Sequence, residues 1–336
     1  MTASASASLI YAAPTPHGTG AITPELPGWP SAGLAASFQA CAEITRAQAR
    51  NFYYGLRLTP EPRRSAIYAI YAWMRAADDL ADEPGDSVER RMQLERFGRE
   101  TRQAMAGDLS GLTDFAFWPA FAATVLSYPV DQGCIADMLA GLGEDQQHAG
   151  YETRDELDRY CYRVGSTVGL TCIAIWGLRP GVDPAEARTK AVARGRGFQL
   201  TNILRDVAQD YDAEPRRVYL PRADLAAHGL TAADLRAWNA PERCRRVLDE
   251  QIERARGFYR ASDGLESLID PGCAPALWGM TRIYAELLER IARDPRRVIT
   301  GPRVRLSAAQ KGLIALSAFI RSGRANSEAG QAGAAR

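Results

Sequence analysis

Apolar residues recur at steps of three and four along most of this chain, and that spacing constrains the fold more than any other feature of the sequence. In the segment 62–83 they are Ile67, Ile70, Tyr71, Met74 and Ala77. This is the period of one face of an α-helix, and Pro84-Gly85 ends the segment. The same spacing recurs in the segments 89–107, 115–126, 131–142, 153–177, 184–210, 231–263 and 273–293. Because alternating β-branched runs are absent, the sequence predicts an all-α fold.

The two ends of the chain differ from this helical body. Residues 1–35 are rich in Ala, Ser, Thr, Pro and Gly and contain neither Lys nor Arg. Such a composition buries too little apolar surface to offset the entropy lost on ordering. Residues 322–336 have a similar composition. We therefore predict a disordered N-terminal tail over 1–35, a single helical domain over 36–310 and a flexible C-terminal tail over 322–336.

Composition excludes several classes of protein. With 46% hydrophobic and 24% charged residues, the chain is typical of a soluble globular protein. Its formal net charge of +1 argues against a broadly polyanionic partner such as nucleic acid. The cysteines form no CxxC pair and the histidines are far apart, so the spacing predicts no zinc site. Since no apolar run reaches ~18 residues and no signal peptide is recognisable, we expect a cytoplasmic protein.

Two carboxylates share one helical face in the segment Arg75-Ala-Ala-Asp78-Asp79-Leu-Ala-Asp82. Asp78 and Asp82 are four residues apart, so their side chains project one turn above the other. Like charges at this spacing destabilise an isolated helix by roughly a few tenths of a kcal/mol. The C-terminal end of a helix also disfavours anions. A bound cation would reverse both penalties.

A second acidic column lies in the segment 199–210. Asn202, Asp206 and Asp210 follow one another at steps of four, and Arg205 lies beside Asp206 as Arg75 lies near the first column. Mg²⁺ prefers oxygen ligands and typically binds one or two carboxylates together with substrate phosphates. Two such columns facing each other would therefore form a metal-dependent diphosphate site. The alternative interpretation of either column alone is a solvated helix face neutralised by arginines.

Five segments, taken in order, resemble the squalene/phytoene synthases, which are head-to-head prenyl transferases of the all-α isoprenoid synthase fold. The segments are Asn51-Phe-Tyr-Tyr-Gly55, Tyr68 to Asp82, Tyr160 to Gly169, Gln199 to Asp210, and Arg217-Val-Tyr-Leu-Pro221. The resemblance covers about residues 38–310. It implies one helical bundle around a central apolar cavity.

The resemblance also implies roles for the matching residues. The ligands of Mg²⁺, with Mn²⁺ as the alternative ion, would be Asp78, Asp82, Asn202, Asp206 and Asp210. The catalytic group would be the four aspartates together with Arg75, Arg205 and Tyr160, the arginines contacting diphosphate. Residues near the prenyl chains would be Phe52, Tyr71, Val164, Val168, Phe198, Gln199 and Tyr284. An aromatic face can stabilise a desolvated cation by ~2 kcal/mol, although core packing explains each aromatic residue equally well.

This chain departs from the family pattern in two places. Many relatives have serines thought to contact diphosphate where this chain has Arg50 and Asn51. A Val-Ala-Gly stretch of the relatives is Val164-Gly165-Ser166 here, and the sequence does not indicate a partner for the added hydroxyl of Ser166. Neither departure changes the acidic columns.

The reaction implied by the resemblance joins two identical prenyl diphosphates through a cyclopropyl intermediate. We expect two farnesyl diphosphates to give presqualene diphosphate or a squalene-type product; the alternative is phytoene from two geranylgeranyl diphosphates. NADPH is not expected, because the short polar C-terminus differs from that of the anchored squalene synthases. A terpene cyclase and a non-catalytic assembly factor fit the motifs less well. Peripheral association with the inner membrane and contact with other isoprenoid-pathway enzymes are left open.

Overall fold

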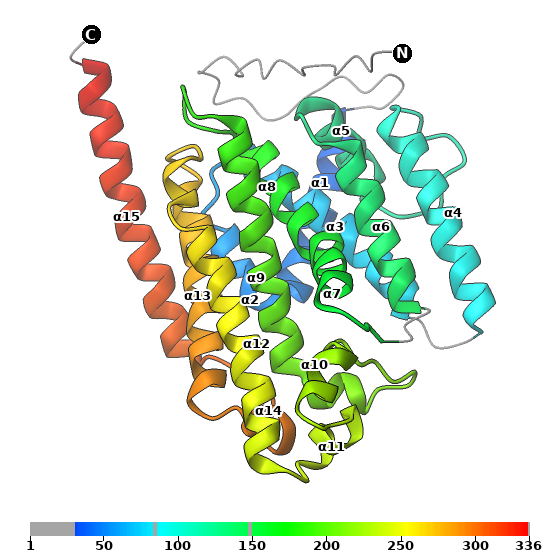
Figure 1. Ribbon diagram of the computed structural model, residues 1–336. Coiled ribbons are helices and arrows are strands. Elements are labelled where there is room, and N and C mark those ends of the chain that lie inside the picture. Colours follow the sequence, from blue (N-terminus) through cyan, green and yellow to red (C-terminus); the bar gives the residue numbers. More distant parts are fainter. Residues whose placement is uncertain (1–30, 83–85, 147–149, 335–336) are drawn as a thin grey trace, which may run out of the picture.

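The structure is a computed structural model that describes residues 31–82, 86–146 and 150–334, with the side chains of residues 50, 51, 82 and 322–334 outside the description. Its regular elements are helices, which make up most of it (Figure 1). In the first half they are α1 (Ser31–Gln48), α2 (Arg50–Leu56), α3 (Arg63–Asp82), α4 (Ser87–Met105), α5 (Trp118–Ser127), α6 (Gln132–Gln146), α7 (Arg154–Cys161), η1 (Tyr162–Ser166) and α8 (Thr167–Trp176). In the second half they are α9 (Pro184–Tyr211), α10 (Arg222–Ala227), α11 (Ala232–Ala237), α12 (Pro241–Ala261), η2 (Leu265–Ser267), α13 (Ala274–Arg293), α14 (Arg297–Thr300) and α15 (Ala308–Ala334).

The prediction of an all-α fold is confirmed. Among the described residues the β-type pairing is limited to an isolated bridge between Leu178 and Ile269. Each of the eight segments with helical spacing lies mainly in helix. In α5, which is deep in the core, seven consecutive residues from Trp118 to Thr124 are buried, so burial there is not confined to one face. In α13, Leu277, Met280, Tyr284 and Leu287 are all buried.

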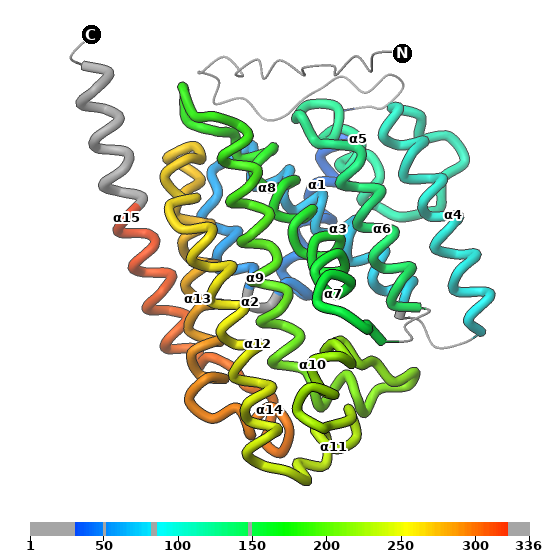
Figure 2. Tube along the Cα trace, viewed as in Figure 1, coloured from blue at the N-terminus to red at the C-terminus, as the bar shows by residue number. Residues whose placement is uncertain are grey.

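The helix α9 is the centre of the bundle. It contacts α7, η1, α8, α11, α12, α13 and α14. The N-terminal helices α1 and α3 to α6 lie on one side of it, and α12, α13 and α15 lie on the other (Figure 2). The C-terminal ends of α3, α6 and α9 point towards the same end of the bundle (Figure 1). Both predicted acidic columns therefore lie at that end.

Two predicted helices are interrupted in the structure. The segment 153–177 forms α7, the π-helical turn η1 and α8. The segment 231–263 is divided between α11 and α12, with Trp238 in the left-handed region at φ 55°. Pro241 begins α12, and a residue before a proline is disfavoured in helical geometry, which explains why the chain breaks there.

The close packing of η1 against α9 explains the first of these interruptions. A Cβ on Gly195 would lie 2.4 Å from Ser166 Cα, and one on Gly165 would lie 2.6 Å from the Gly195 carbonyl oxygen. The two backbones therefore touch, and only glycines allow this contact. The buried hydroxyl of Ser166, whose role the sequence left open, donates to the Val192 carbonyl oxygen at 2.7 Å.

Helix also occupies parts of the two predicted tails. The helix α1 begins at Ser31, inside the segment 1–35, and α15 includes residues 322–334. Residues 1–30 lie outside the described residues, so the N-terminal tail stays a prediction, as do the flexibility of the C-terminus and the domain limits. Within the described ranges, no helix is both long enough and apolar enough to cross a membrane.

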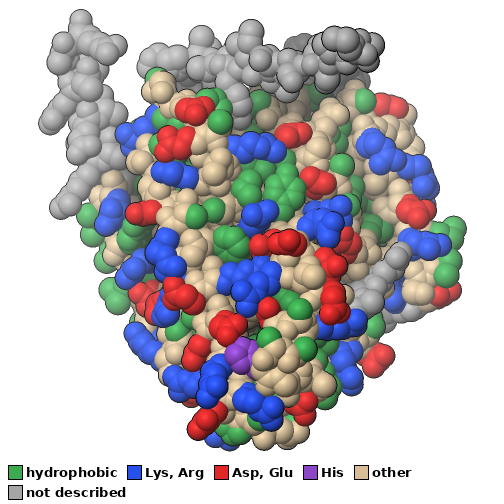
Figure 3. Space-filling model, in the orientation of Figure 1, with side chains coloured by type: hydrophobic (Ala, Val, Ile, Leu, Met, Phe, Trp, Pro, Cys, Tyr) green, Lys and Arg blue, Asp and Glu red, His purple; other side chains and the backbone are tan. Residues whose placement is uncertain are grey.

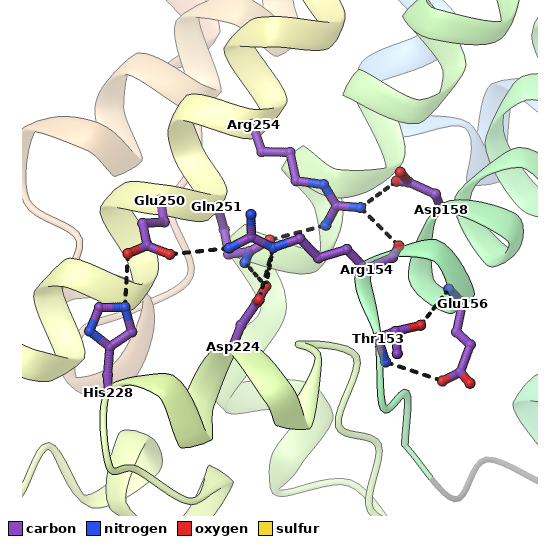
Figure 4. A network of polar contacts seen from close by, with 9 residues as sticks. All are labelled: Thr153, Arg154, Glu156, Asp158, Asp224, His228, Glu250, Gln251 and Arg254. Carbon is purple, nitrogen blue, oxygen red and sulfur yellow. Dashed lines mark hydrogen bonds and ion pairs between the residues drawn. The ribbon is translucent and has the colours of Figure 1, made fainter.

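A polar network joins α7, α10 and α12 (Figure 4). Arg154 Nε donates to both oxygens of Asp224 at 2.8 and 2.9 Å, and Gln251 donates to the same carboxylate at 2.5 Å. Arg254 pairs with Asp158 at 2.6 Å. The network fixes α7 relative to α10, and therefore the tyrosine of α7 relative to the 217–221 motif that precedes α10.

Candidate active site

Asp206 lies between two arginines near the end of α9. Arg205 Nε donates to one carboxylate oxygen at 2.9 Å, and Arg303 Nε and Nη2 donate to the two oxygens at 2.7 Å each. The Asp206 side chain is only 13% exposed. Burial alone would raise the pKa of this carboxyl, but the hydrogen bonds and charges of both arginines hold it below its ordinary value. Asp206 is therefore a buried, ionised carboxylate.

Asp210, one turn further along α9, has the opposite electrostatic environment. Burial and the negative charge of Asp206 raise the pKa of Asp210 to about 7, and Asp145 adds to the rise while Arg217 opposes it. The Arg217 backbone N–H donates to the Asp210 carbonyl oxygen at 2.9 Å, which ties the 217–221 motif to the end of α9. Negative charge is thus in excess here, a condition that a cation would relieve.

Asp145 is a site residue that the sequence reasoning missed. It lies at the end of α6, and its carboxylate accepts hydrogen bonds from Tyr160 at 2.7 Å and from Tyr219 at 2.9 Å. The two tyrosine rings stack with centroids 5.2 Å apart. Burial, followed by the charge of Asp145, raises the pKa of the Tyr160 hydroxyl well above its ordinary value, so the hydroxyl stays protonated. In the sequence, Asp145 is visible only as an acidic residue just after the predicted helical segment 131–142. Its two tyrosine partners are distant in sequence, so no local pattern marks it as part of the site.

The first acidic column has a more open environment on α3. The Arg75 guanidinium pairs with Asp79 and lies 3.9 Å from Asp78, and the Asp78 side chain is 50% exposed. The structure therefore adds Asp79 as the nearest partner of Arg75, whereas the sequence interpretation related Arg75 to Asp78. Asp82 ends α3, and its side chain lies outside the described residues.

The structure does not assemble a closed metal site from the residues it describes. No group of three or more His, Cys, Asp or Glu side chains there lies close enough to bind one ion. This finding covers neither Asp82 nor the amide of Asn202. The predicted ligand set thus stays a prediction, as does the central apolar cavity.

The chemistry of the α9 residues nevertheless fits a divalent cation. The Oδ1 atom of Asn202 is buried and has no hydrogen-bond partner, although a buried acceptor without a partner costs free energy. Asn202 lies one turn before Asp206, and the Asn202 Nδ2 atom is 3.5 Å from Gln199 Oε1. An unsatisfied amide oxygen in line with two carboxylates is the donor set that Mg²⁺ prefers.

Three predicted prenyl-chain residues form an aromatic cluster, which we define as Phe52, Phe198 and Tyr284. The ring centroid of Tyr284 lies 5.3 Å from that of Phe52 and 4.6 Å from that of Phe198. Burial raises the pKa of Tyr284 to about 12, against the opposing charge of Arg205. The cluster therefore lies next to Arg205 of α9. The other predicted residues of this group keep partial exposure: Tyr71, Val164, Val168 and Gln199.

Comparison with known proteins identifies the family. A family model described as squalene/phytoene synthase matches residues 45–310. The phytoene synthase of Arthrospira platensis is 36% identical over 267 residues, covering 77% of this chain and 84% of the relative. A chloroplastic phytoene synthase of Zea mays is also 36% identical, over 262 residues that cover 77% of this chain and 60% of the relative.

The fold agrees with this result. A crystal structure of a dehydrosqualene synthase superposes with a TM-score of 0.74 at 26% identity, covering 85% of this chain and 96% of that one. This chain belongs to the squalene/phytoene synthase family. It is therefore an enzyme of the head-to-head prenyl transferase class, as the motifs indicated.

Proposed function

We propose that this enzyme condenses two molecules of geranylgeranyl diphosphate head to head to give phytoene, with Mg²⁺ as its metal ion. From the sequence alone, the farnesyl reaction is the first expectation and this one is the alternative. The order is reversed because relatives at 36% identity are phytoene synthases, whereas the dehydrosqualene synthase is 26% identical.

The observation that supports the diphosphate site is the group of arginines among the acidic columns. Arg205 and Arg303 contact Asp206, and Arg75 pairs with Asp79 and lies 3.9 Å from Asp78. The planar guanidinium of arginine binds phosphate oxygens in pairs. An incoming diphosphate would therefore compete with Asp206 for Arg205 and Arg303 and release carboxylate oxygens.

The proposed ligands of the metal are Asp78, Asp82, Asn202, Asp206 and Asp210. Bound Mg²⁺ would neutralise the charge that develops on the diphosphate leaving group. Arg75, Arg205 and Arg303 would add donors to the same group. Tyr160, whose hydroxyl is protonated and bound to Asp145, would maintain the position of that carboxylate beside Asp210.

Cleavage of the allylic carbon–oxygen bond leaves a delocalised carbocation. The faces of Phe52, Phe198 and Tyr284 would stabilise it, and Tyr71, Val164, Val168 and Gln199 would complete the wall around the prenyl chains. Aromatic faces attract cations most strongly when water is absent. Exclusion of water also prevents premature capture of the cation.

The test is to incubate the purified full chain with Mg²⁺ and with each prenyl diphosphate separately, and to identify the extracted lipid by mass spectrometry. We expect phytoene from geranylgeranyl diphosphate, and no product after chelation of the metal. A squalene-type product from farnesyl diphosphate alone would favour the alternative supported by the structural neighbour. A cyclic product from a single diphosphate would indicate a terpene cyclase, and the absence of both product and diphosphate release would indicate a scaffold.

A further inference from the structure

The helix α15 exposes large hydrophobic side chains within eight residues. Leu313, Leu316, Phe319 and Ile320 are 64, 55, 65 and 51% exposed, and we call these four residues the outer face of α15. The other exposed large hydrophobic residues in the described ranges are scattered over α2, α4 and α5. Hydrophobic side chains gather at the edge of the molecule where α15 lies (Figures 1 and 3). A hydrophobic surface of this kind marks an interaction site.

The opposite face of α15 is packed against the protein. Ala318 is fully buried, and Ile314 contacts the hydrophobic cluster that contains Tyr284. The helix contacts α13 and α2. Its inner side is therefore fixed by packing, and the four residues of the outer face are exposed in this arrangement.

The region around α15 is strongly basic. Between Asp294 and Glu328 the sequence has no acidic residue, and its basic residues are Arg296, Arg297, Arg303, Arg305, Lys311, Arg321 and Arg324. Arg305 and Arg321 are exposed, and the Arg321 guanidinium lies 4.5 Å from the ring centroid of Trp278. On the neighbouring α13, Glu286 pairs with Arg282 at 2.9 Å and Glu289 with Arg256 at 2.7 Å, so these acids do not neutralise the basic residues of α15.

We propose that the outer face of α15 docks on an anionic lipid bilayer. A helix with a row of large apolar side chains bordered by Lys and Arg binds the interface of such a membrane, where the apolar groups enter the acyl boundary and the basic groups contact phosphate headgroups. Self-association through the same face would bring Lys311 and Arg321 of one copy close to the same residues of the other copy, and these like charges repel. Charge complementarity therefore favours an anionic bilayer over a second copy of the chain.

This docking would place the bilayer close to the aromatic cluster. Ile314 on the inner face of α15 and Phe52 on α2 belong to the same hydrophobic cluster as Tyr284 and Phe198. If the proposed function holds, a lipophilic product leaves these residues next to the membrane that dissolves it. The docking itself depends only on the outer face and its charge, so it can be tested independently of activity.

Flotation of the purified full chain with lipid vesicles tests the proposal. We expect binding to vesicles of phosphatidylcholine mixed with phosphatidylglycerol, weaker binding to phosphatidylcholine alone, and a decline in binding as salt is raised. The double variant Leu313→Ser/Leu316→Ser should reduce the partition coefficient at least about tenfold, because two leucines no longer enter the bilayer. The matched control is Met92→Ser/Leu126→Ser, which removes residues that are 62 and 51% exposed on α4 and α5 and should leave binding unchanged.

Three results would overturn the proposal: no binding of the wild-type chain, equal binding by the two double variants, or binding that does not depend on phosphatidylglycerol or salt. Light scattering after size exclusion provides a further check. A wild-type dimer that becomes a monomer in Leu313→Ser/Leu316→Ser would assign the face to a second copy instead. Far-UV circular dichroism verifies the fold of each variant, and the lipid and salt dependence of the wild type does not rely on any variant.

Discussion

Arg303 donates a hydrogen bond to each carboxylate oxygen of Asp206, at 2.7 Å, although the two residues are 97 positions apart. Arg303 lies in the connection between α14 and α15, and Asp206 lies near the end of the central helix. The pair therefore ties the second acidic column to the segment that leads into α15. No local pattern in the sequence indicates this pair, because the contact depends on how distant segments pack.

Removal of Arg303 should weaken the fold measurably. In Arg303→Ala, Asp206 keeps Arg205 but loses two charge-assisted hydrogen bonds, so the free energy of unfolding should fall by about 1–3 kcal/mol. Urea unfolding measures this change, and Arg303→Lys should give an intermediate value because it keeps the charge without the paired geometry. Arg305→Ala, which changes an exposed neighbour, is the control. Equal stability of the two alanine variants would show that the contact contributes nothing.

Asp210 predicts a specific pH dependence for the metal-free enzyme. Its pKa is raised from 3.8 to about 7, so the folded chain binds this proton more tightly than the unfolded chain does. The contribution of this proton to the free energy of unfolding is fully present below about pH 4. It is lost as the pH rises to about 7, which lowers the free energy of unfolding by up to about 4 kcal/mol. Asp210→Asn should remove this loss.

The measurement compares the unfolding free energies of wild type and Asp210→Asn across that pH range. The variant should become the more stable protein above about pH 7, and the difference should shrink towards pH 4. The exposed Asp294→Asn change is the control. A constant difference at all pH values would contradict the raised pKa. Saturation of the wild type with Mg²⁺ should reduce the difference, because a cation favours the ionised carboxylate.

The contact between η1 and α9 predicts contrasting effects of two glycine substitutions. In Gly195→Ala the added Cβ meets Ser166 backbone at 2.4 Å, so we expect a loss of about 1–3 kcal/mol or more. In Gly257→Ala the nearest atom is Arg260 Nη2 at 3.8 Å, and the better helix propensity of alanine should add about 0.5–1 kcal/mol. Thermal unfolding distinguishes the two outcomes. If Gly195→Ala proved as stable as wild type, the close backbone approach would be wrong.

Local patterns in the sequence predicted most of the fold. The apolar spacing that identified the segments 62–83 and 273–293 is a property of a few consecutive turns, and α3 and α13 occupy those segments. The helices α1 and α15 were not predicted, because small residues such as Ala and Ser dominate them and obscure the apolar period. The π-helical turn η1 depends on a contact with Gly195, a residue about thirty positions away, so no local pattern could indicate it.

The candidate site was predictable only in part for the same reason. Asp206, Asp210 and Asn202 share a face of one helix, which the spacing of four already implied. The contributions of Asp145 and Arg303 come from α6 and from the segment before α15, and they depend on how distant helices pack. The choice of prenyl chain length followed from relatives rather than from any residue pattern in this chain.

In the proposed function, the columns on α3 and α9 bind the same metal-diphosphate cluster. The binding of Mn²⁺ in the presence of inorganic diphosphate, measured by electron paramagnetic resonance, tests this shared cluster. The titration compares the wild type with Asp78→Asn, Asp206→Asn and the double variant, and Asp294→Asn is the control. We expect each single site variant to weaken Mn²⁺ binding at least about tenfold and the double variant to lose less than the sum of the two free energies, because both residues act on one cluster. Full Mn²⁺ binding by Asp78→Asn, or strictly additive losses in the double variant, would contradict the claim.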